Sequence, residues 1–181
     1  MTQPDELKTH LQLRPAEPRD AATILAFIRE LADYEKLLHE VTATETEVRD
    51  TLFGDDPDAA VIMAEWGGEP AGFALYHGMY STFLARSGYY LEDLYVRPAF
   101  RGRGIGKALL TALAHQAVET GQCRLDWSCL DWNEPSLAFY RTLGARELSE
   151  WTRLRLDGAA LEAVAARAFD TGFVEPSGID A

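Results

Sequence analysis

The period of hydrophobic and polar positions changes several times along the chain, and each change predicts an element. Residues 11–14 (LQLR) alternate in polarity, which is typical of a short strand. Between residues 20 and 37, apolar side chains recur every three or four positions, so we expect a helix with one buried face and with Asp20 as its cap. A second, more acidic helix is expected over residues 44–52, because Gly54 and Pro57 interrupt the pattern.

Three segments with the composition of strands follow this second helix. Residues 59–66 and 70–78 flank Gly67 and Gly68, which predicts a hairpin. Residues 89–96 (YYLEDLYV) predict a further strand that ends before Pro98. Strands that succeed one another directly indicate an antiparallel meander.

The second half of the chain alternates between helical and strand-like patterns. Residues 104–121 have the spacing of a helix that stops at Gly121, and residues 124–130 predict the next strand. Asn133 is placed to cap a short helix, with Pro135 in its first turn and Gly144 after its end. Residues 151–156 (WTRLRL) predict one more strand and residues 159–169 a helical tail. We therefore expect residues 1–181 to form one α/β domain with a mixed sheet, in which residues 1–10 are loose.

The composition fits a single domain that buries a real core. The chain has 181 residues, of which 47% are hydrophobic. Its net charge of -12 at pH 7 argues against a nucleic-acid-binding surface and favours cationic partners. No apolar run approaches the roughly 18 residues that a membrane span needs, and the first residues lack the pattern of a secretion signal. We expect a cytoplasmic protein that binds neither nucleic acid nor a membrane.

The positions of cysteine and histidine argue against disulfides and metals. Cys123 lies directly before the strand predicted over residues 124–130 and Cys129 lies within it, so the two are poorly placed to meet, and this fits a reducing compartment. The histidines are scattered without the spacing of metal ligands, and neither cysteine belongs to a CxxC pair. We expect no metal site and no cysteine nucleophile.

A glycine-rich, basic loop connects the predicted strand of residues 89–96 to the predicted helix of residues 104–121. Successive glycines at the start of a helix let backbone N–H groups crowd around an anion at its positive end. Four cationic residues lie in this loop and in the first turn of the helix, although the protein is acidic overall: Arg97, Arg101, Arg103 and Lys107. A phosphate site is favoured, and the alternative is a solvated turn with chance arginines.

The spacing of these glycines excludes two familiar phosphate loops. Three residues separate Gly102 from Gly106 where a Walker A loop has four, and Lys107 is followed by Ala108 instead of Ser or Thr. The glycines follow GxGxG and not GxGxxG, and they do not follow the first strand of a βαβ unit, so the dinucleotide-binding fingerprint also fails. A nucleoside triphosphatase and a Rossmann enzyme are therefore disfavoured.

Residues 101–106 (RGRGIG) resemble the R/Q-x-x-G-x-G/A loop that holds the pyrophosphate of acetyl-CoA in the GNAT superfamily of N-acetyltransferases. YLEDLYV, DWNEPSLAFYRTLGA and RPAEPRDAATILAFIRELADYEKL extend the similarity, in particular to the spermidine/spermine and thialysine branch. The resemblance covers residues 11–161 and implies a mixed, mostly antiparallel central sheet flanked by helices. It also implies acetyl-CoA as co-substrate, held by the backbone of Leu94, Tyr95 and Val96, by Asn133, and along the loop by Arg101, Gly102, Arg103, Gly104, Ile105, Gly106 and Lys107.

Glu92 is the candidate base. Strict alternation along its strand places Glu92 on the face of Tyr90, Leu94 and Val96, and Asp93 on the opposite face with Leu91 and Tyr95. The two acids are therefore not expected to pair. A carboxylate on a largely apolar face loses hydration, which makes it a better proton acceptor. The resemblance implies that Glu92 removes a proton from the amine, directly or through water, and the alternative is a structural ion pair with an arginine.

The resemblance also assigns roles that the residue pattern leaves open. It implies that Tyr140 protonates the departing CoA thiolate, although helical spacing with its apolar neighbours equally suits a packing residue. Glu35 and Asp93 are candidate contacts of a cationic substrate, and Trp151 is a candidate pocket wall. Residues 80–84 (YSTFL) lack the acid that the polyamine enzymes carry there, so a long polyamine is disfavoured.

These features predict an N-acetyltransferase that moves acetyl from acetyl-CoA to a primary amine of a small cationic substrate, such as a diamine, a polyamine or a lysine-like amine. The amine would attack directly within a ternary complex. An acetyltransferase for protein lysines or N-termini would use the same core. A non-catalytic acyl-CoA-binding module would keep the loop and dispense with Glu92 and Tyr140. The resemblance further implies a homodimer with the C-terminal strand region near its interface.

Overall fold

The computed structural model describes residues 7 and 9–166 of the 181-residue chain. The described chain divides after Ser128 into two compact units. We call the residues up to Ser128 the first unit and those from Cys129 onward the second unit. That both units belong to one domain stays a prediction. Within the described residues, no helix is both long and apolar enough to cross a membrane.

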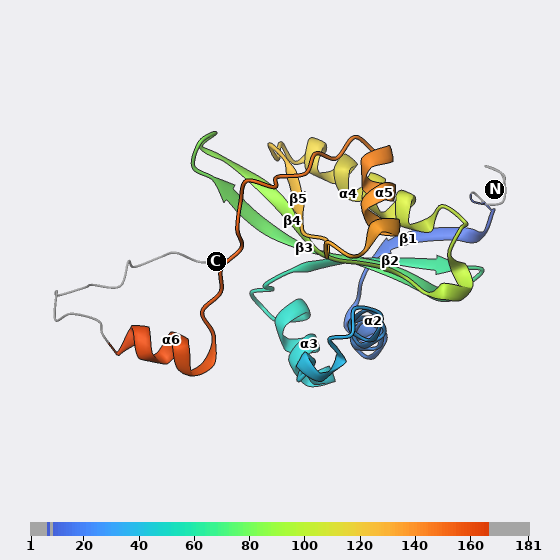
Figure 1. Cartoon of the computed structure of the whole chain (residues 1–181). Coiled ribbons are helices and arrows are strands. Elements are labelled where there is room, and N and C mark those ends of the chain that lie inside the picture. The colour runs from blue at the N-terminus through green and yellow to red at the C-terminus, as the bar shows by residue number, and fades with distance from the viewer. Residues whose placement is uncertain (1–6, 8, 167–181) are drawn as a thin grey trace. The chain divides into compact units, whose positions relative to one another are not determined.

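The first unit is built on a five-stranded sheet in the order β1-β2-β3-β4-β5 (Figure 1). Its strands are β1 (Leu11–Pro15), β2 (Ala60–Trp66), β3 (Glu69–Ser81), β4 (Arg86–Val96) and β5 (Leu125–Trp127). The first four pair antiparallel, and β5 pairs parallel to β4. Gly67 and Gly68 both have the positive φ that a two-residue hairpin turn requires. The mixed, mostly antiparallel sheet is confirmed.

Helices cover both faces of this sheet (Figure 1). α2 (Ala21–Tyr34) and α3 (Glu45–Phe53) lie on one face, and α4 (Ile105–Glu119) lies on the other. On the α2 face, Phe27 stacks on Phe73 of β3 with 5.4 Å between ring centroids, and both are fully buried. On the α4 face, Gln116 donates a hydrogen bond to the hydroxyl of Tyr76 on β3. The two faces can therefore be told apart by these contacts.

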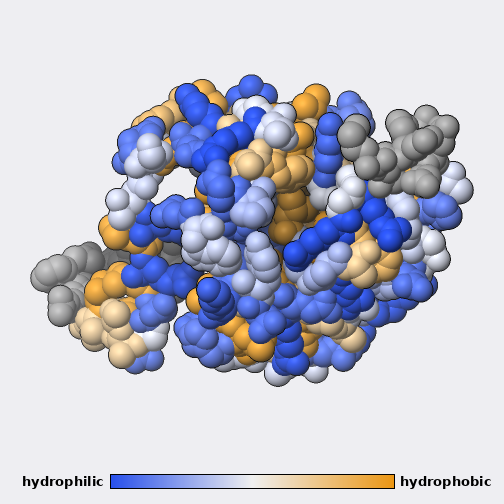
Figure 2. Space-filling view, turned by 45° about the vertical axis from the view of Figure 1, so that its right-hand side comes forward, coloured by the Kyte–Doolittle hydropathy of each residue, from blue (hydrophilic) through white to orange (hydrophobic). Residues whose placement is uncertain are grey.

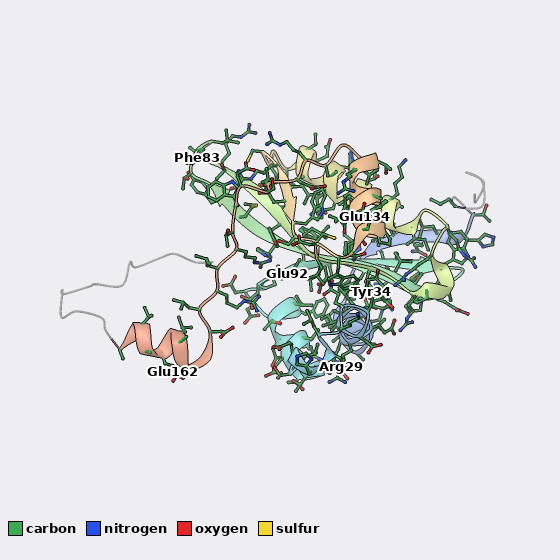
Figure 3. The ribbon with its side chains drawn as sticks, in the orientation of Figure 1. Arg29, Tyr34, Phe83, Glu92, Glu134 and Glu162 are labelled. Carbon is green, nitrogen blue, oxygen red and sulfur yellow. The ribbon has the colours of Figure 1, made fainter. Side chains whose placement is uncertain are left out.

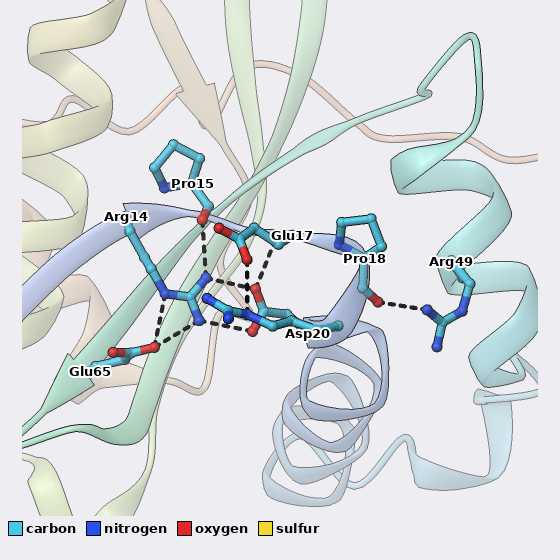
Figure 4. Close-up of polar contacts among 8 residues, drawn as sticks. Arg14, Pro15, Glu17, Pro18, Asp20, Arg49 and Glu65 are labelled. Carbon is cyan, nitrogen blue, oxygen red and sulfur yellow. Dashed lines mark hydrogen bonds and ion pairs between the residues drawn. The ribbon is translucent and has the colours of Figure 1, made fainter.

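A group of ion pairs connects β1, β2 and the start of α2 (Figure 4). Arg14 on β1 donates hydrogen bonds to Asp20 at 2.7 Å and to Glu65 at 2.9 Å, and Asp20 also accepts from the backbone N–H of Glu17. The hydrogen bond from Arg14 lowers the pKa of the Asp20 carboxyl. Asp20 is the N-cap residue of α2, as predicted, but its side chain makes no capping hydrogen bond to the helix. The Asp20 carboxylate instead accepts hydrogen bonds from the Arg14 guanidinium and from the backbone N–H of Glu17.

Several element boundaries in the first unit differ from the predicted ones: β3 runs on to Ser81, β4 begins at Arg86, and α2 and β5 are shorter than expected. α2 ends at Tyr34, before the predicted end, and Lys36 follows with a φ of 64°, which a helix does not tolerate. β5 is limited to Leu125–Trp127 and does not extend over residues 124–130. The two cysteines therefore do not share a strand, and neither forms a disulfide.

The second unit contains α5 (Glu134–Thr142) and α6 (Gly158–Ala165). Asn133 caps α5, as predicted, by accepting a hydrogen bond from the N–H of Ser136. Residues 151–156 form no strand, so that prediction is wrong. Their alternation suits the surface of a sheet, but a strand needs a partner for its backbone groups, and the described part of the chain supplies none there. The helical tail begins at Gly158, and residues 167–169 lie outside the described residues.

Candidate active site

The basic loop lies between β4 and the N-terminus of α4, as the sequence predicts. A 3-10 turn (Pro98–Phe100) leads into it, and Gly104 is the N-cap of α4 with a φ of 83°. Gly102 also has a positive φ, of 75°, so both positions favour glycine. The first N–H groups of an α-helix have no partner within the helix, and α4 presents them to the loop. Lys107 is exposed in the first turn of α4.

Two arginines of the loop lie against aromatic rings. The guanidinium carbon of Arg101 is 5.1 Å from the ring centre of Tyr34, and that of Arg103 is 5.1 Å from the ring of Trp66. Arg101 also donates a hydrogen bond to the carbonyl of Val96 at 2.9 Å. Stacking fixes the plane of a guanidinium while its remaining N–H groups can still bind a phosphate. These two side chains are therefore placed in advance at the loop.

Arg97, the first cation of the basic segment, serves a different purpose. It donates to the carboxylate of Glu30 on α2 at 2.8 Å and to the carbonyl of Pro70 at 3.1 Å, and its guanidinium lies over the ring of Phe27. The hydrogen bond from Arg97 lowers the pKa of Glu30. Arg97 thus connects α2 to the sheet, and the candidate phosphate-binding cations are reduced to Arg101, Arg103 and Lys107.

One edge of β4 is open where β5 has ended. β5 pairs only with Tyr89–Leu91, so no described strand covers β4 from Glu92 to Val96 on that side. The N–H of Arg97 donates to Ala71 of the β3 side, and antiparallel pairing alternates, so the backbone groups of Leu94 and Val96 face the open edge. The bond from Arg101 to the Val96 carbonyl agrees with this direction. Backbone groups at this edge are available to a ligand.

A β-bulge interrupts β4 at Glu92. Leu75 on β3 pairs with Asp93, whereas the next residue, Tyr76, pairs with Leu91, so Glu92 is the extra residue. Directly paired residues share a face, which puts Asp93 on the α2 face and Leu91 on the α4 face. The predicted alternation, with Leu91 and Asp93 on one face, is therefore wrong. Sequence periodicity could not reveal this, because the bulge depends on how β4 pairs with β3.

The bulge brings the two neighbouring acids onto the same face. Oε2 of Glu92 lies 3.7 Å from Nε2 of His77 on β3, and His77 lies two residues from Leu75, so Glu92 also lies on the α2 face. Figure 3 shows Glu92 on the side of the sheet that faces α2 and α3. The predicted separation of Glu92 and Asp93 is corrected accordingly.

Three carboxylates act on one another here, and we call Glu92, Asp93 and Glu35 the acid group. Burial raises the pKa of half-buried Asp93 to about 7, with further contributions from the charges of Glu92 and Glu35. Burial also raises the pKa of Glu35, which follows the last residue of α2. An uncompensated set of carboxylates of this kind favours a cationic ligand. Glu35 and Asp93, two candidate substrate contacts, are thus brought into electrostatic contact.

Glu92 itself is less buried than its sequence surroundings suggest. Its side chain is 47% exposed, so the expected desolvation on an apolar face is not found. The half-buried carboxylate of the pair is Asp93. The Glu92 carboxylate is therefore accessible to water and to a ligand. The carboxyl of Asp93 lies on the same face and is more buried.

An open pocket of about 400 Å³ lies beside Arg101. Its lining residues are Glu30, Asp33, Tyr34, Tyr95, Pro98 and Arg101. The members of the acid group do not line it, so this pocket is separate from the acid group. Two carboxylates share it with one guanidinium, which suits a polar or cationic group better than a phosphate.

The remaining candidate residues belong to the second unit. Tyr140 is half-buried on α5, and its ring lies 5.2 Å from that of Phe139. Asn133 is buried and uses its side-chain oxygen to cap α5. Trp151 is 71% exposed. In the second unit, Asn133 caps a helix and Trp151 has an exposed ring. The roles of both residues toward ligands stay predictions.

Sequence reasoning missed His77, Tyr34 and Trp66. His77 lies opposite Tyr90 across the hairpin of β3 and β4, so the hairpin register would have been needed to place it beside Glu92. Tyr34 and Trp66 are the last residues of α2 and β2, and they reach the loop only in the folded chain. No local pattern marks such contacts.

The similarities to known proteins agree with this geometry. The model of the acetyltransferase (GNAT) family matches residues 25–145. A thialysine N-epsilon-acetyltransferase of Sus scrofa is 39% identical over 86% of this chain and 97% of its own length. An L-ornithine N5-acetyltransferase of Arabidopsis thaliana is 32% identical over 90% of this chain and 91% of its own length.

A solved structure has a similar fold. The integron cassette protein from V. cholerae has a TM-score of 0.73 and 26% identity, and the match covers 86% of this chain and 98% of that protein. The resemblance seen in the motifs is therefore confirmed. By sequence and by fold, this chain belongs to the acetyltransferase (GNAT) family of enzymes.

Proposed function

We propose that this enzyme transfers acetyl from acetyl-CoA to a primary amine of a small cationic substrate, within a ternary complex. The observation that carries the proposal is the combination, along β4, of Glu92 and Asp93 with an open edge that leads into the basic loop. A phosphate-bearing thioester fits the loop and the edge, and an ammonium group fits the acids.

The loop and the open edge suit CoA in separate ways. Arg101, Arg103 and Lys107 provide positive charge at the N-terminus of α4, which matches a diphosphate. The backbone groups of Leu94 and Val96 suit an amide-bearing arm that adds to the sheet like a strand. When bound, acetyl-CoA would supply an activated acetyl thioester.

The chain's own residues would then move the protons. An amine is protonated near neutral pH and must lose a proton before its nitrogen can attack a carbonyl carbon. Glu92, which is exposed on the bulge, accepts this proton directly or through water. As the new C–N bond forms and the C–S bond breaks, Tyr140 donates a proton to the leaving sulfur. A second acid beside Glu92 holds any further positive charge of the substrate.

A small diamine or a lysine-like amine is the proposed substrate class, in preference to spermine. Two relatives are named for acting on thialysine and L-ornithine, which supports this class. The net charge of -12 attracts cations, and Asp93 and Glu35 add local negative charge beside Glu92. Residues 80–84 carry no acid that would meet a distant ammonium group of a long polyamine.

An acceptor screen scored by release of CoA tests the proposal. The panel holds lysine, ornithine, thialysine, short diamines, spermidine, spermine and a lysine-containing peptide. We expect the highest kcat/KM among the small amines, and a loss of roughly 100-fold in Glu92→Gln on the best of them. Turnover of spermine or of the peptide far above the small amines would overturn the substrate class. Binding of acetyl-CoA without turnover of any amine would instead favour a non-catalytic binding module.

A further inference from the structure

We propose that His77 is a positioning residue that acts through Glu92 and receives the proton that Glu92 takes from the amine. This inference rests on the proposed function, because it takes Glu92 to be the base. It adds a residue to which the sequence motifs assign no role.

The hydrogen bond of His77 determines which ring nitrogen is basic. Nδ1 lies 2.9 Å from the carbonyl oxygen of Gly78, and a carbonyl oxygen only accepts hydrogen bonds, so Nδ1 carries the hydrogen. In the neutral ring, Nε2 then has a lone pair and no hydrogen. It is this nitrogen that lies 3.7 Å from Oε2 of Glu92. The basic nitrogen of His77 is therefore aimed at the candidate base.

Neighbouring contacts hold the imidazole in this orientation. His77 pairs with Tyr90 across β3 and β4, and the two rings lie 5.4 Å apart. The hydroxyl of Tyr90 is in turn hydrogen-bonded to Ser128 at 2.7 Å. Because Glu92 is the extra residue of the bulge, its side chain turns toward this ring pair. The register of β3 with β4 thus places Nε2 beside the carboxylate.

The proton balance of the relay is simple. An N–H bond of the substrate ammonium breaks and an O–H bond forms on Glu92, and then that O–H bond breaks as an N–H bond forms on Nε2 of His77. The separation of 3.7 Å is longer than a hydrogen bond, and a small side-chain shift closes it. His77 is 38% exposed, so the imidazolium can release the proton to solvent and return to the neutral state.

The charged and titratable groups on this face agree with such a role. From β4 they are Tyr90, Glu92 and Asp93, and from the end of α2 Glu35 acts on Asp93. Negative charge predominates among them, so an imidazolium that forms transiently here is surrounded by attractive charge. No cation of the basic loop takes part in these contacts.

The tautomer of His77 provides a test without any substrate. Nitrogen-15 NMR of the histidine-labelled apo protein, assigned with the His77→Phe variant, should show neutral His77 protonated at Nδ1. A neutral ring protonated at Nε2 would overturn the proposal, because its basic nitrogen would then point away from Glu92.

Kinetics test the relay itself. His77→Phe keeps a ring on Tyr90 and removes both nitrogens, and we expect kcat/KM for the amine to fall about tenfold near neutral pH, with the KM for acetyl-CoA unchanged. The loss should shrink as pH rises, because more of the amine arrives already deprotonated. His77→Gln cannot take up a proton and should show the same loss, so it replaces the Phe variant if that one does not fold. His115→Phe, an exposed histidine on α4, should match wild type.

A double-mutant cycle separates failure of this inference from failure of the proposed function. If His77 acts only through Glu92, the double variant His77→Phe with Glu92→Gln is no slower than Glu92→Gln alone. If the losses in kcat/KM of the two single variants multiply in the double variant, His77 has only a structural role. The same conclusion follows if the loss in His77→Phe does not vary with pH. Full activity of the His77 variants beside a slow Glu92→Gln would overturn the relay and leave the proposed function standing. Full activity of Glu92→Gln would overturn the relay and the role of Glu92 as the base, whereas a wild type that turns over no amine would overturn the proposed function.

Discussion

Two adjacent carboxylates on β4 have different surroundings, and this difference matters at the scale of single residues. Glu92 is nearly half exposed beside His77, whereas Asp93 is half-buried with a pKa raised to about 7. Near neutral pH, Asp93 is therefore divided between its charged and neutral forms. A cation bound beside it would favour the charged form, so substrate binding and ionisation of Asp93 are coupled.

Asp93→Asn should stabilise the folded protein in a pH-dependent way. Its folded pKa of about 7 lies above the value of about 3.9 of an unfolded chain, so the carboxyl lowers stability fully above pH 7 and less as pH falls toward 4. We expect urea unfolding to show a gain of about 1–3 kcal/mol at pH 8 and a smaller gain at pH 5. Asp50→Asn, an exposed change on α3, should alter neither. An equal gain at both pH values would assign the effect to packing.

Tyr140→Phe tests the proposed proton donor. The change keeps the ring on α5 and removes only the hydroxyl, so thermal unfolding and acetyl-CoA affinity should stay near wild type. We expect kcat to fall about 10- to 1000-fold when chemistry limits turnover, which single-turnover measurements establish. A wild-type rate under those conditions would make Tyr140 a packing residue.

At the scale of elements, the loop that we propose binds the diphosphate has its arginines held by residues of other elements. Tyr34 at the end of α2 and Trp66 at the end of β2 each support one loop arginine. Gly104 gives the helix its left-handed N-cap, and an added Cβ there would meet Leu7 at 3.0 Å. The loop geometry thus depends on α2 and β2 as well as on its own glycines.

Removal of both loop arginines should weaken acetyl-CoA binding. For Arg101→Ala with Arg103→Ala we expect the Kd from calorimetry to rise at least about tenfold, the equivalent of 1.4 kcal/mol, and wild-type affinity to fall as salt rises. Arg19→Ala with Arg29→Ala removes the same charge from exposed positions and should leave the Kd nearly unchanged. If both double variants bind alike, the assignment of the loop to the diphosphate is wrong.

At the scale of the whole molecule, surface charge and exposed hydrophobic residues point to different partners. Hydrophilic residues cover most of the face seen in Figure 2, in keeping with the net charge of -12. Within the second unit, however, Trp151 and Leu154 are 71% and 87% exposed. Large exposed apolar side chains close together in sequence are typical of surfaces that a partner covers.

A second copy of the chain is the partner we predict for this segment. Light scattering at micromolar concentration should give the mass of a homodimer, and Trp151→Ser with Leu154→Ser should shift it toward the monomer. Phe83→Ser, on the exposed turn between β3 and β4, serves as a control for loss of an exposed apolar residue. A monomeric mass for the wild type would refute the prediction.

The sequence by itself determined the features that depend on neighbours a few residues apart. Helical spacing located α2, α3 and α4, glycine pairs located the first hairpin turn, and the RGRGIG loop was placed correctly between β4 and α4. Such signals are local, because side chains three or four positions apart share a helix face and a turn needs particular backbone angles. The cap at Asn133 is of the same kind.

Only the tertiary structure decided which acids meet. The bulge at Glu92 arises from the register of β4 against β3, and it reverses the face of every residue beyond it, which no periodicity along β4 alone reveals. The same long-range pairing ends β5 at Trp127, leaves residues 151–156 without a strand partner, and sets His77 beside Glu92. These features depend on residues far apart in the chain, so their physical cause, pairing between strands, exists only after folding.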